Sequence, residues 1–258
     1  MRWTVNGINS ASGDLRTDAN GRGSFEYIGA NPGIDRVEAY VDENGNGVRD
    51  EGEPQREATV EWTGPDAPQF ATEVNVRPTG GRVLIRLPRG AAVKGKWAHA
   101  AQSRFVRLTD AKQVPVGAEM NVKRGTVSLT SSKGPTGGVQ TSQFYSGRFV
   151  VRQPRRERGM TEMRLSEPMK CTPNTRRGKV VASAVRTRRL WGRGRGRFRT
   201  RGRNSSATVR GTTWLQKDTC TTTTTIVRDG TVIVKDFAKR KNVRVKAPRR
   251  HVARARRR

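Results

Sequence analysis

The chain has few of the residues that build metal centres, and it has no long apolar run. Its 258 residues include two cysteines and two histidines, too few for four zinc ligands at local spacing. No window approaches the ~18 continuous apolar residues of a membrane-spanning helix. Residues 1–5 lack the apolar run of a secretory signal, so we expect any export signal to lie outside this sequence.

Recognisable catalytic motifs are also missing. The sequence has no Gly-x-Ser-x-Gly elbow, no phosphate-binding glycine loop ending in Lys-Ser/Thr, and no His-Glu-x-x-His. The two histidines, His99 and His251, are far apart in the chain. Hydrophobic residues make up 33% and aromatic residues 6%, which suits thin β-modules better than one large core. The sequence therefore predicts a protein that is not an enzyme.

Acidic residues are concentrated near the start of the sequence. The formal net charge is +30, but residues 1–63 contain six Lys/Arg against twelve Asp/Glu. Residues 64–258 contain 46 Lys/Arg against ten Asp/Glu, and the change falls at the turn-rich stretch 64–68. A surface this basic attracts polyanions over long range, and salt weakens the attraction. The expected partner is an anionic cell-envelope polymer or another polyanion, with non-specific nucleic-acid binding as a further option.

Short β-branched segments separated by Gly, Pro, Asn and Asp dominate the pattern. Apolar and polar residues alternate in 36–42, 57–62, 81–87 and 231–236, as half-buried strands require. No long stretch has helical periodicity. An all-β fold is therefore predicted.

A short motif recurs in the basic part of the chain: Gly, any residue, Val or Phe, any residue, then an aliphatic residue. It begins at Gly81, Gly125, Gly147 and Gly230. The glycine leaves a turn, and the two alternate apolar residues face the core. Any all-β chain can contain such a motif by chance, but four copies favour a sheet with one apolar face and one cationic face.

Residues 42–53 read DENGNGVRDEGE and match the twelve-residue loop that wraps a calcium ion. Gly47, at the sixth position, allows the sharp turn. Strands are expected on both sides, so the loop is not a helix–loop–helix sensor. A structural calcium ion that stiffens the hairpin is predicted, and a polar Asn-Gly hairpin without an ion is the alternative. The predicted ligands are the oxygens of Asp42, Asn44, Asn46, Val48 (backbone carbonyl), Asp50 and Glu53.

Two cysteines in a chain expected to be exported favour one disulfide between Cys171 and Cys220. Two unrelated buried thiols are the alternative. A thiol count on the native protein separates an oxidising from a reducing compartment.

Residues 186–203 carry nine arginines and four glycines. One reading is a nucleic-acid-binding segment in which arginines pair with phosphates while Trp191 and Phe198 stack on bases. The other, which the alternation R-G-R-F-R-T-R favours, is a β-hairpin with arginines facing solvent. The predicted polyanion-binding residues are Arg193, Arg195, Arg197, Arg199, Arg201 and Arg203.

Residues 5–63 resemble the bacterial immunoglobulin-like repeats of surface proteins. The resemblance is carried by VNGIN, by TDANG at 17–21, and by the run from 34 to 62 that ends at Trp62. Such repeats begin with two further strands before the one that corresponds to residues 2–5. The resemblance therefore implies an incomplete sandwich with an exposed edge at residues 2–6.

Five further stretches of the chain are VPVG (114–117), KRGTVSL (123–129), FYSGRF (144–149), ATVRGT (207–212) and VRDGTVIV (227–234). With them, roughly residues 74–253 resemble FecR-like β-domains of bacterial envelope and extracellular proteins. The arrangement is similar to that of exported actinobacterial proteins of unknown activity. Some proteins of this kind signal across a membrane, a role that needs a spanning helix, which this sequence lacks.

These observations predict an all-β protein in four parts. They are an incomplete immunoglobulin-like sandwich (1–63), a linker (64–73), FecR-like β-sheet modules (74–253, with a possible division into 74–170 and 171–253), and a basic tail (254–258). The Arg-rich final ten residues are expected to be disordered. The predicted function is that of an extracellular or cell-surface structural or adhesive protein, with nucleic-acid binding through the Arg/Gly-rich segments as the alternative.

Overall fold

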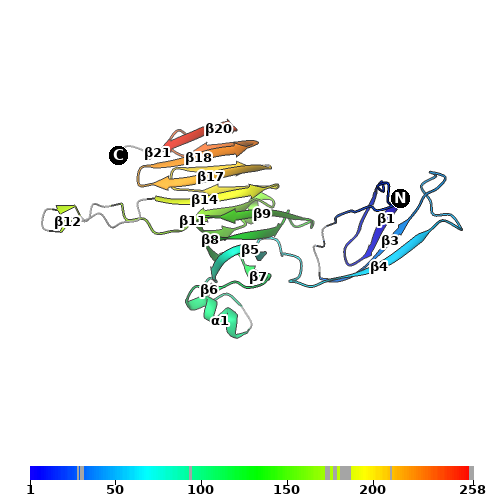
Figure 1. Ribbon diagram of the computed structural model, residues 1–258. Coiled ribbons are helices and arrows are strands. Elements are labelled where there is room, and N and C mark those ends of the chain that lie inside the picture. The colour runs from blue at the N-terminus through cyan, green and yellow to red at the C-terminus, as the bar shows by residue number, and fades with distance from the viewer. Residues whose placement is uncertain are drawn as a thin grey trace. The chain divides into compact units, whose positions relative to one another are not determined.

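A computed structural model describes the chain except for residues 28, 30, 31, 93, 94, 172–174, 177, 178, 181–186, 210 and 256–258. Strands dominate the described residues, together with one short helix, α1 (Lys96–Ser103), and a 3-10 turn, η1 (Arg155–Glu157) (Figure 1). The predicted all-β class is confirmed. The chain divides into two compact units, Met1–Ala67 and Pro68–Arg258, and the division falls inside the predicted linker.

The first unit contains one antiparallel sheet in the order β2-β1-β3-β4. β1 is an inner strand, because Arg2 lies opposite Asp14 on one side and opposite Tyr40 on the other. The expected exposed edge at residues 2–6 is therefore wrong, and the edges are β2 and β4. The strands are β1 (Arg2–Gly7), β2 (Ala11–Asp14), β3 (Gly33–Tyr40) and β4 (Gln55–Trp62).

The core of the first unit is small and aromatic. Trp3 and Val5 of β1 are buried with Val37 of β3 on one face of the sheet. Phe25, from the loop between β2 and β3, stacks on Trp3 with ring centroids 4.1 Å apart. One sheet face is thus covered by the chain's own loop, so this unit is built as a sheet and a covering segment.

The second unit is built on one sheet of 15 strands. Its main path runs β20-β19-β16-β15-β11-β10-β8-β9-β14-β17-β18-β21; off this path, β5 pairs with β8, and β6 and β7 pair with β5. The strands are β5 (Glu73–Arg86), β6 (Val106–Arg107), β7 (Lys112–Pro115), β8 (Glu119–Ser132), β9 (Val139–Tyr145), β10 (Arg148–Arg152), β11 (Thr161–Leu165), β14 (Thr187–Gly194), β15 (Phe198–Arg201), β16 (Ser205–Val209), β17 (Thr212–Thr219), β18 (Thr222–Asp229), β19 (Thr231–Asp236), β20 (Lys241–Lys246) and β21 (Arg250–Arg254). A separate ribbon pairs β12 (Thr175–Arg176) with β13 (Lys179–Val180).

This sheet folds into two layers that share one core. The first layer contains β9, β14, β17, β18 and β21, and the second contains β10, β11, β15, β16, β19 and β20. Phe144 of β9 packs across the layers against Phe149 of β10 and Phe198 of β15, with centroids 5.4 and 6.0 Å apart. The long strand β8 belongs to both layers, because its first residues pair with β10 and its last residues with β9.

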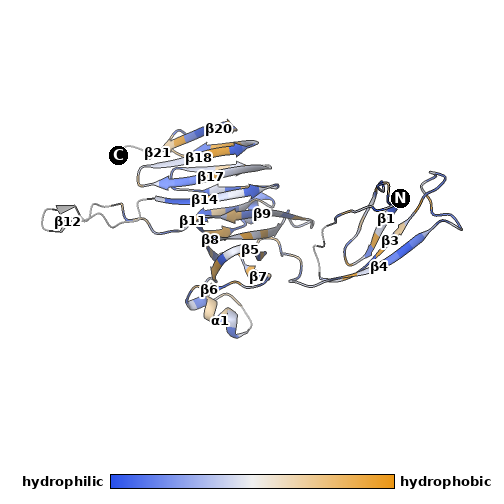
Figure 2. Cartoon of the chain, in the orientation of Figure 1, coloured by the Kyte–Doolittle hydropathy of each residue, from blue (hydrophilic) through white to orange (hydrophobic). Residues whose placement is uncertain are grey.

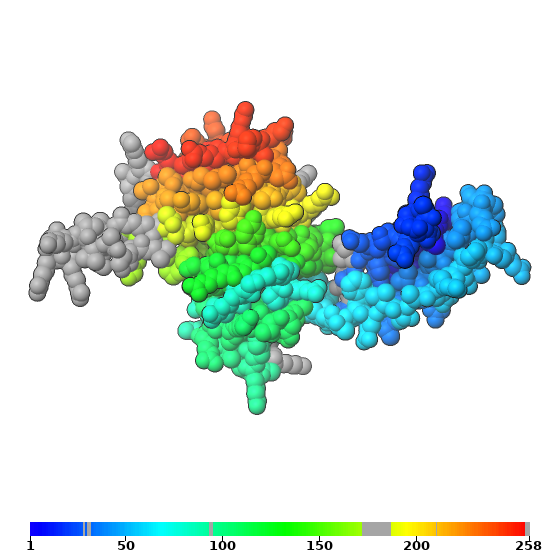
Figure 3. Space-filling model, in the orientation of Figure 1, coloured from blue at the N-terminus to red at the C-terminus, as the bar shows by residue number. Residues whose placement is uncertain are grey.

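The layers grow in chain order from β5 to β21. The successive colour bands of the second unit follow this order in the space-filling view (Figure 3). The ranges 74–170 and 171–253 both contribute strands to the same sheet and residues to the same core. Hydrophobic and hydrophilic residues are mixed along the strands, as expected for strands with one buried side (Figure 2).

The recurring glycine motif has the predicted orientation. In all four copies both alternate apolar residues are buried, with exposed fractions of 1% or less: Val83, Ile85, Val127, Leu129, Phe149, Val151, Val232 and Val234.

The basic end of the sequence is more ordered than expected. Residues 250–254 form β21, which pairs antiparallel with β18, so disorder was the wrong expectation for this stretch. His251 Nε2 lies 3.0 Å from Asp236 Oδ2 and links β21 to the end of β19. Residues 256–258 of the predicted tail lie outside the described residues. No helix in the described part of the chain is long and apolar enough to cross a membrane.

Candidate functional site

The predicted calcium loop joins β3 to β4, two strands that pair along their whole length. The Val41 N–H donates to the Pro54 carbonyl at 3.0 Å and closes the base of the loop. Gly47 has a φ of +83°, a left-handed conformation that glycine adopts without strain. The strand–loop–strand context and the sharp turn at Gly47 are as the sequence predicted.

The loop brings its polar side chains together around Asp50. Asn44 Nδ2 and Asn46 Nδ2 donate to the same oxygen, Asp50 Oδ2, at 2.6 and 2.8 Å. Glu53 Oε2 accepts the Asp50 backbone N–H at 3.0 Å, and Glu53 Oε1 accepts the N–H of Glu43 at 2.9 Å. Asp50 is thus the centre of the group, with one carboxylate oxygen shared by two amides.

Asp42 has one carboxylate oxygen bonded and one without a partner. Its Oδ2 accepts the Gly47 N–H at 3.0 Å and lies 3.4 Å from Arg2 Nε. Its Oδ1 is buried and makes no hydrogen bond with any residue that the structure describes, and the side chain is only 10% exposed. A buried carboxylate oxygen without a partner is costly, and a cation removes that cost.

The remaining predicted ligand, Val48, lies in the same turn. Its N–H donates to Asn46 Oδ1 at 2.8 Å, and its side chain is exposed. Among the described residues, no group of three or more His, Cys, Asp and Glu side chains lies close enough together to hold a metal ion. The three predicted carboxylate ligands, Asp42, Asp50 and Glu53, therefore do not come together as a metal-binding group in this structure.

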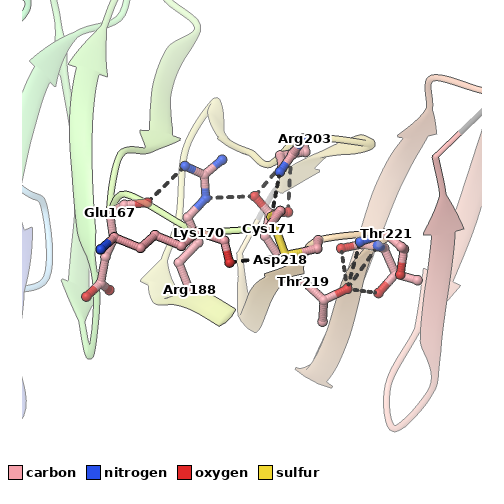
Figure 4. The surroundings of a disulfide bond; sticks show 10 residues. Glu167, Lys170, Cys171, Arg188, Arg203, Asp218, Thr219 and Thr221 are labelled. Atoms are coloured by element: carbon pink, nitrogen blue, oxygen red, sulfur yellow. Dashed lines mark hydrogen bonds and ion pairs between the residues drawn. A yellow bond between two sulfur atoms is a disulfide. The ribbon is translucent and has the colours of Figure 1, made fainter. Parts of the chain in front are cut away.

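The predicted disulfide between Cys171 and Cys220 is present, with Cα atoms 5.4 Å apart. It lies beside a buried ion pair (Figure 4), in which the fully buried Asp218 accepts from Arg188 Nε at 2.9 Å. Arg203 Nη1 donates to Cys171 Sγ at 3.2 Å. The disulfide joins the segment after β11 to the β17–β18 turn.

The Arg-rich stretch forms two strands that do not pair with each other, and the second of them, β15, forms an antiparallel hairpin with β16. β14 pairs with β9 and β17 in the first layer. β15 pairs with β11 and β16 in the second layer. The chain crosses between the layers at residues 195–197. Alternation of residues predicts a strand, but it contains no information about which strand lies beside it.

The structure divides the six predicted polyanion-binding arginines into two groups. Arg199 pairs with Glu157 and Glu162, and the Arg201 guanidinium lies 4.8 Å from the Phe237 ring centroid. Burial by itself lowers the pKa of Arg199, but the two glutamates outweigh it and raise that pKa above its ordinary value.

Arg203 is engaged through its backbone N–H, which donates to Asp218, and through its contact with Cys171. Arg193, Arg195 and Arg197 are exposed. Their guanidiniums make no hydrogen bond, ion pair or ring contact with described residues. These three side chains lie at and beside the crossing between the layers, and they are the members of the set that remain available to a ligand.

The two aromatic residues of this stretch are engaged in the fold. Phe198 is fully buried in the core. Trp191 stacks against Tyr145 with centroids 6.1 Å apart, and the Arg228 guanidinium lies 4.4 Å from its ring centroid. Phe198 is thus not placed to stack on nucleic-acid bases, and Trp191 already has a neighbour on its ring.

No family model, no curated protein and no solved structure matches this chain. The immunoglobulin-like and FecR-like resemblances therefore stay predictions.

Proposed function

We propose that this chain is a non-enzymatic extracellular or cell-surface structural or adhesive protein. In this proposal a calcium ion stiffens the β3–β4 hairpin, and a basic surface on the second unit holds an anionic polymer. The Cys171–Cys220 disulfide supports an oxidising compartment, because cytosolic proteins rarely keep such bonds.

The observation that carries the calcium site is the unpartnered Oδ1 of Asp42. It lies in a loop where Asn44, Asn46 and Asp50 already converge. Calcium prefers carboxylate, amide and backbone oxygens, and residues that carry all of these stand at the sequence positions of a twelve-residue calcium loop. When bound, the ion would replace the amide–carboxylate hydrogen bonds with direct oxygen contacts and fix the loop.

Calorimetric titration of the full chain with calcium tests this site. We expect one site, with binding abolished by a D42A/D50A double substitution. The matched control is E26A/E61A, which removes two exposed carboxylates of the same unit from outside the loop. No binding heat from the folded native chain, or equal loss in both variants, would rule out the calcium site.

The polyanion surface is supported by the charge of the second unit and by the three arginines whose guanidiniums have no partner among the described residues. Arg193, Arg195 and Arg197 project from the point where the chain crosses between the layers. Arginine pairs well with phosphate and sulfate oxygens, and neutralising several of them releases counterions. Their contribution should therefore be large at low salt and fall steeply as salt is added.

The test is binding of random DNA, random RNA and a poly(glycerol phosphate) polymer of matched charge across a salt series. We expect comparable affinities, and a smaller salt slope for the R193Q/R195Q/R197Q variant. R152Q/R164Q/R244Q removes the same charge from exposed positions of the second layer and should change the slope less. A strong preference for one nucleotide sequence that persists at high salt would overturn this proposal and favour the nucleic-acid alternative.

A further inference from the structure

Two arginines face each other across β5 and β8, and no acid among the described residues pairs with either of them. Arg82 lies directly opposite Arg124 in the antiparallel register. Both side chains are exposed, and neither makes a hydrogen bond, ion pair or ring contact with a described residue. Like charges directly opposite on neighbouring strands destabilise a sheet. The pair is therefore unfavourable for folding in the absence of a ligand.

A β-bulge adds a third cation to this pair. Arg82 pairs with Arg124 and Leu84 with Asn121, so β8 has one more residue than β5 in this interval. The extra residue interrupts the alternation of sides: Val122 is buried, and both Lys123 and Arg124 are exposed. Bulges commonly redirect side chains beside functional sites.

The glycines beside the arginines bring the two backbones close together. Gly81 lies opposite Gly125, and a Cβ at Gly125 would lie 2.7 Å from the Arg82 carbonyl oxygen. Gly81 has a φ of +65°, and a Cβ there would also meet the backbone of Arg124. The local backbone thus leaves little room to separate the two arginines along the strands.

The cations line a pocket of about 300 Å³ together with Leu84 and Asn121. Asn121 Oδ1 accepts the Lys123 N–H at 3.3 Å, and no hydrogen bond of its amide Nδ2 to another described residue competes with a ligand. Lys123 also pairs with Glu167, so the two arginines supply most of the uncompensated charge. Leu84 adds apolar surface. This volume lies at the lower end of small-molecule sites.

We propose that this pocket binds a phosphate or sulfate ester on a small polar body the size of glycerol or a monosaccharide. Arg82 and Arg124 donate to the tetrahedral anion from opposite strands, and their mutual repulsion is relieved when it is bound. Asn121 and Leu84 contact the esterified group. The site is separate from the three arginines at the layer crossing and does not depend on the polyanion proposal.

Calorimetry on the full chain at fixed ionic strength tests the pocket with glycerol 3-phosphate, inorganic phosphate and glycerol. We expect saturable 1:1 binding of glycerol 3-phosphate, weaker binding of inorganic phosphate, and none of glycerol. R82Q/R124Q should weaken binding about 10-fold or more, since charged hydrogen bonds are lost. The control R152Q/R164Q removes the same charge elsewhere and should leave the affinity within about 2-fold.

A second measurement separates binding from folding. Without ligand, R82Q/R124Q should unfold at the same or a higher urea concentration than the native chain, because it removes a repulsion. Equal weakening by the control pair, absence of saturable binding, or inorganic phosphate binding as tightly as the ester would overturn the proposal. A marked loss of stability in R82Q/R124Q would assign these arginines a structural role and also overturn it.

Discussion

At the scale of single residues, a buried polar cluster of the second unit surrounds Asp218. This fully buried carboxylate accepts from Arg188 at 2.9 Å, from the hydroxyl of Thr223 at 2.6 Å, and from the backbone of Arg203. Asp218 lies on the buried side of β17 together with Trp214 and Gln216. Nothing in the sequence distinguishes it from an exposed acid.

Replacing Asp218 with alanine should destabilise the second unit by about 3–5 kcal/mol. The reason is that Arg188, only 17% exposed at its side chain, loses its counter-charge and cannot be fully rehydrated. Urea unfolding measures the loss. Asp229→Ala, at an exposed position of the next strand, should change stability by less than about 0.5 kcal/mol. Similar small changes in both variants would show that the ion pair contributes little.

At the scale of elements, long bent strands and one covalent bond connect the layers. β5 and β8 each contain 14 residues and have irregular register at two points, which lets them pass from one layer into the other. The disulfide fixes the segment after β11 to the β17–β18 turn, across 48 intervening residues. The two long strands and the disulfide thus hold together parts of the sheet that are far apart in sequence.

Removing the disulfide with C171S/C220S should lower the free energy of unfolding by roughly 4 kcal/mol, the loop-closure entropy for this length. The measurement is urea unfolding of the native chain with and without reductant, beside the double variant. Reduced native protein should match the variant. An unchanged midpoint in the reduced protein would mean that the unfolded chain gains no freedom, contrary to this expectation.

At the scale of the whole molecule, buried carboxylates make both units sensitive to acid. For Asp35, Glu119 and Asp236 burial by itself raises the pKa, but hydrogen bonds and nearby cations outweigh it, and the pKa of each is lowered. The donors include Asn9 for Asp35, Arg148 for Glu119, and the Lys239 backbone and His251 for Asp236. Asp35 belongs to the first unit and the other two to the second.

Because the folded-state pKa values are lowered, the unfolded chain binds more protons than the folded chain in mildly acidic solution. The stabilisation is therefore fully present above the ordinary carboxyl values, about 4 to 4.5, and is lost as the pH falls through the folded values. The urea concentration at the midpoint of unfolding, measured from pH 7 to pH 3, should decrease once the pH drops below these ordinary carboxyl values. Asp236→Asn should give a flatter profile for the second unit, and an identical profile would contradict the assignment.

The sequence by itself determined the local features of this protein. Period-two alternation fixes which side of a strand is buried, as at Val127 and Leu129, because side chains on a strand point alternately to opposite faces. The spacing of oxygen-bearing residues likewise predicted a tight loop at 42–53, where Asn44 and Asn46 both hydrogen-bond to Asp50. The change of charge near residue 64 marked the junction of the two units.

Only the tertiary structure decided what lies beside each strand. β14 and β15 follow each other in sequence, yet they lie in different layers, because both bury apolar residues, Leu190 and Phe198, in the space between them. The inner position of β1 and the facing pair Arg82 and Arg124 likewise depend on partners distant in sequence. Pairing register is a property of two segments, so no single segment contains it.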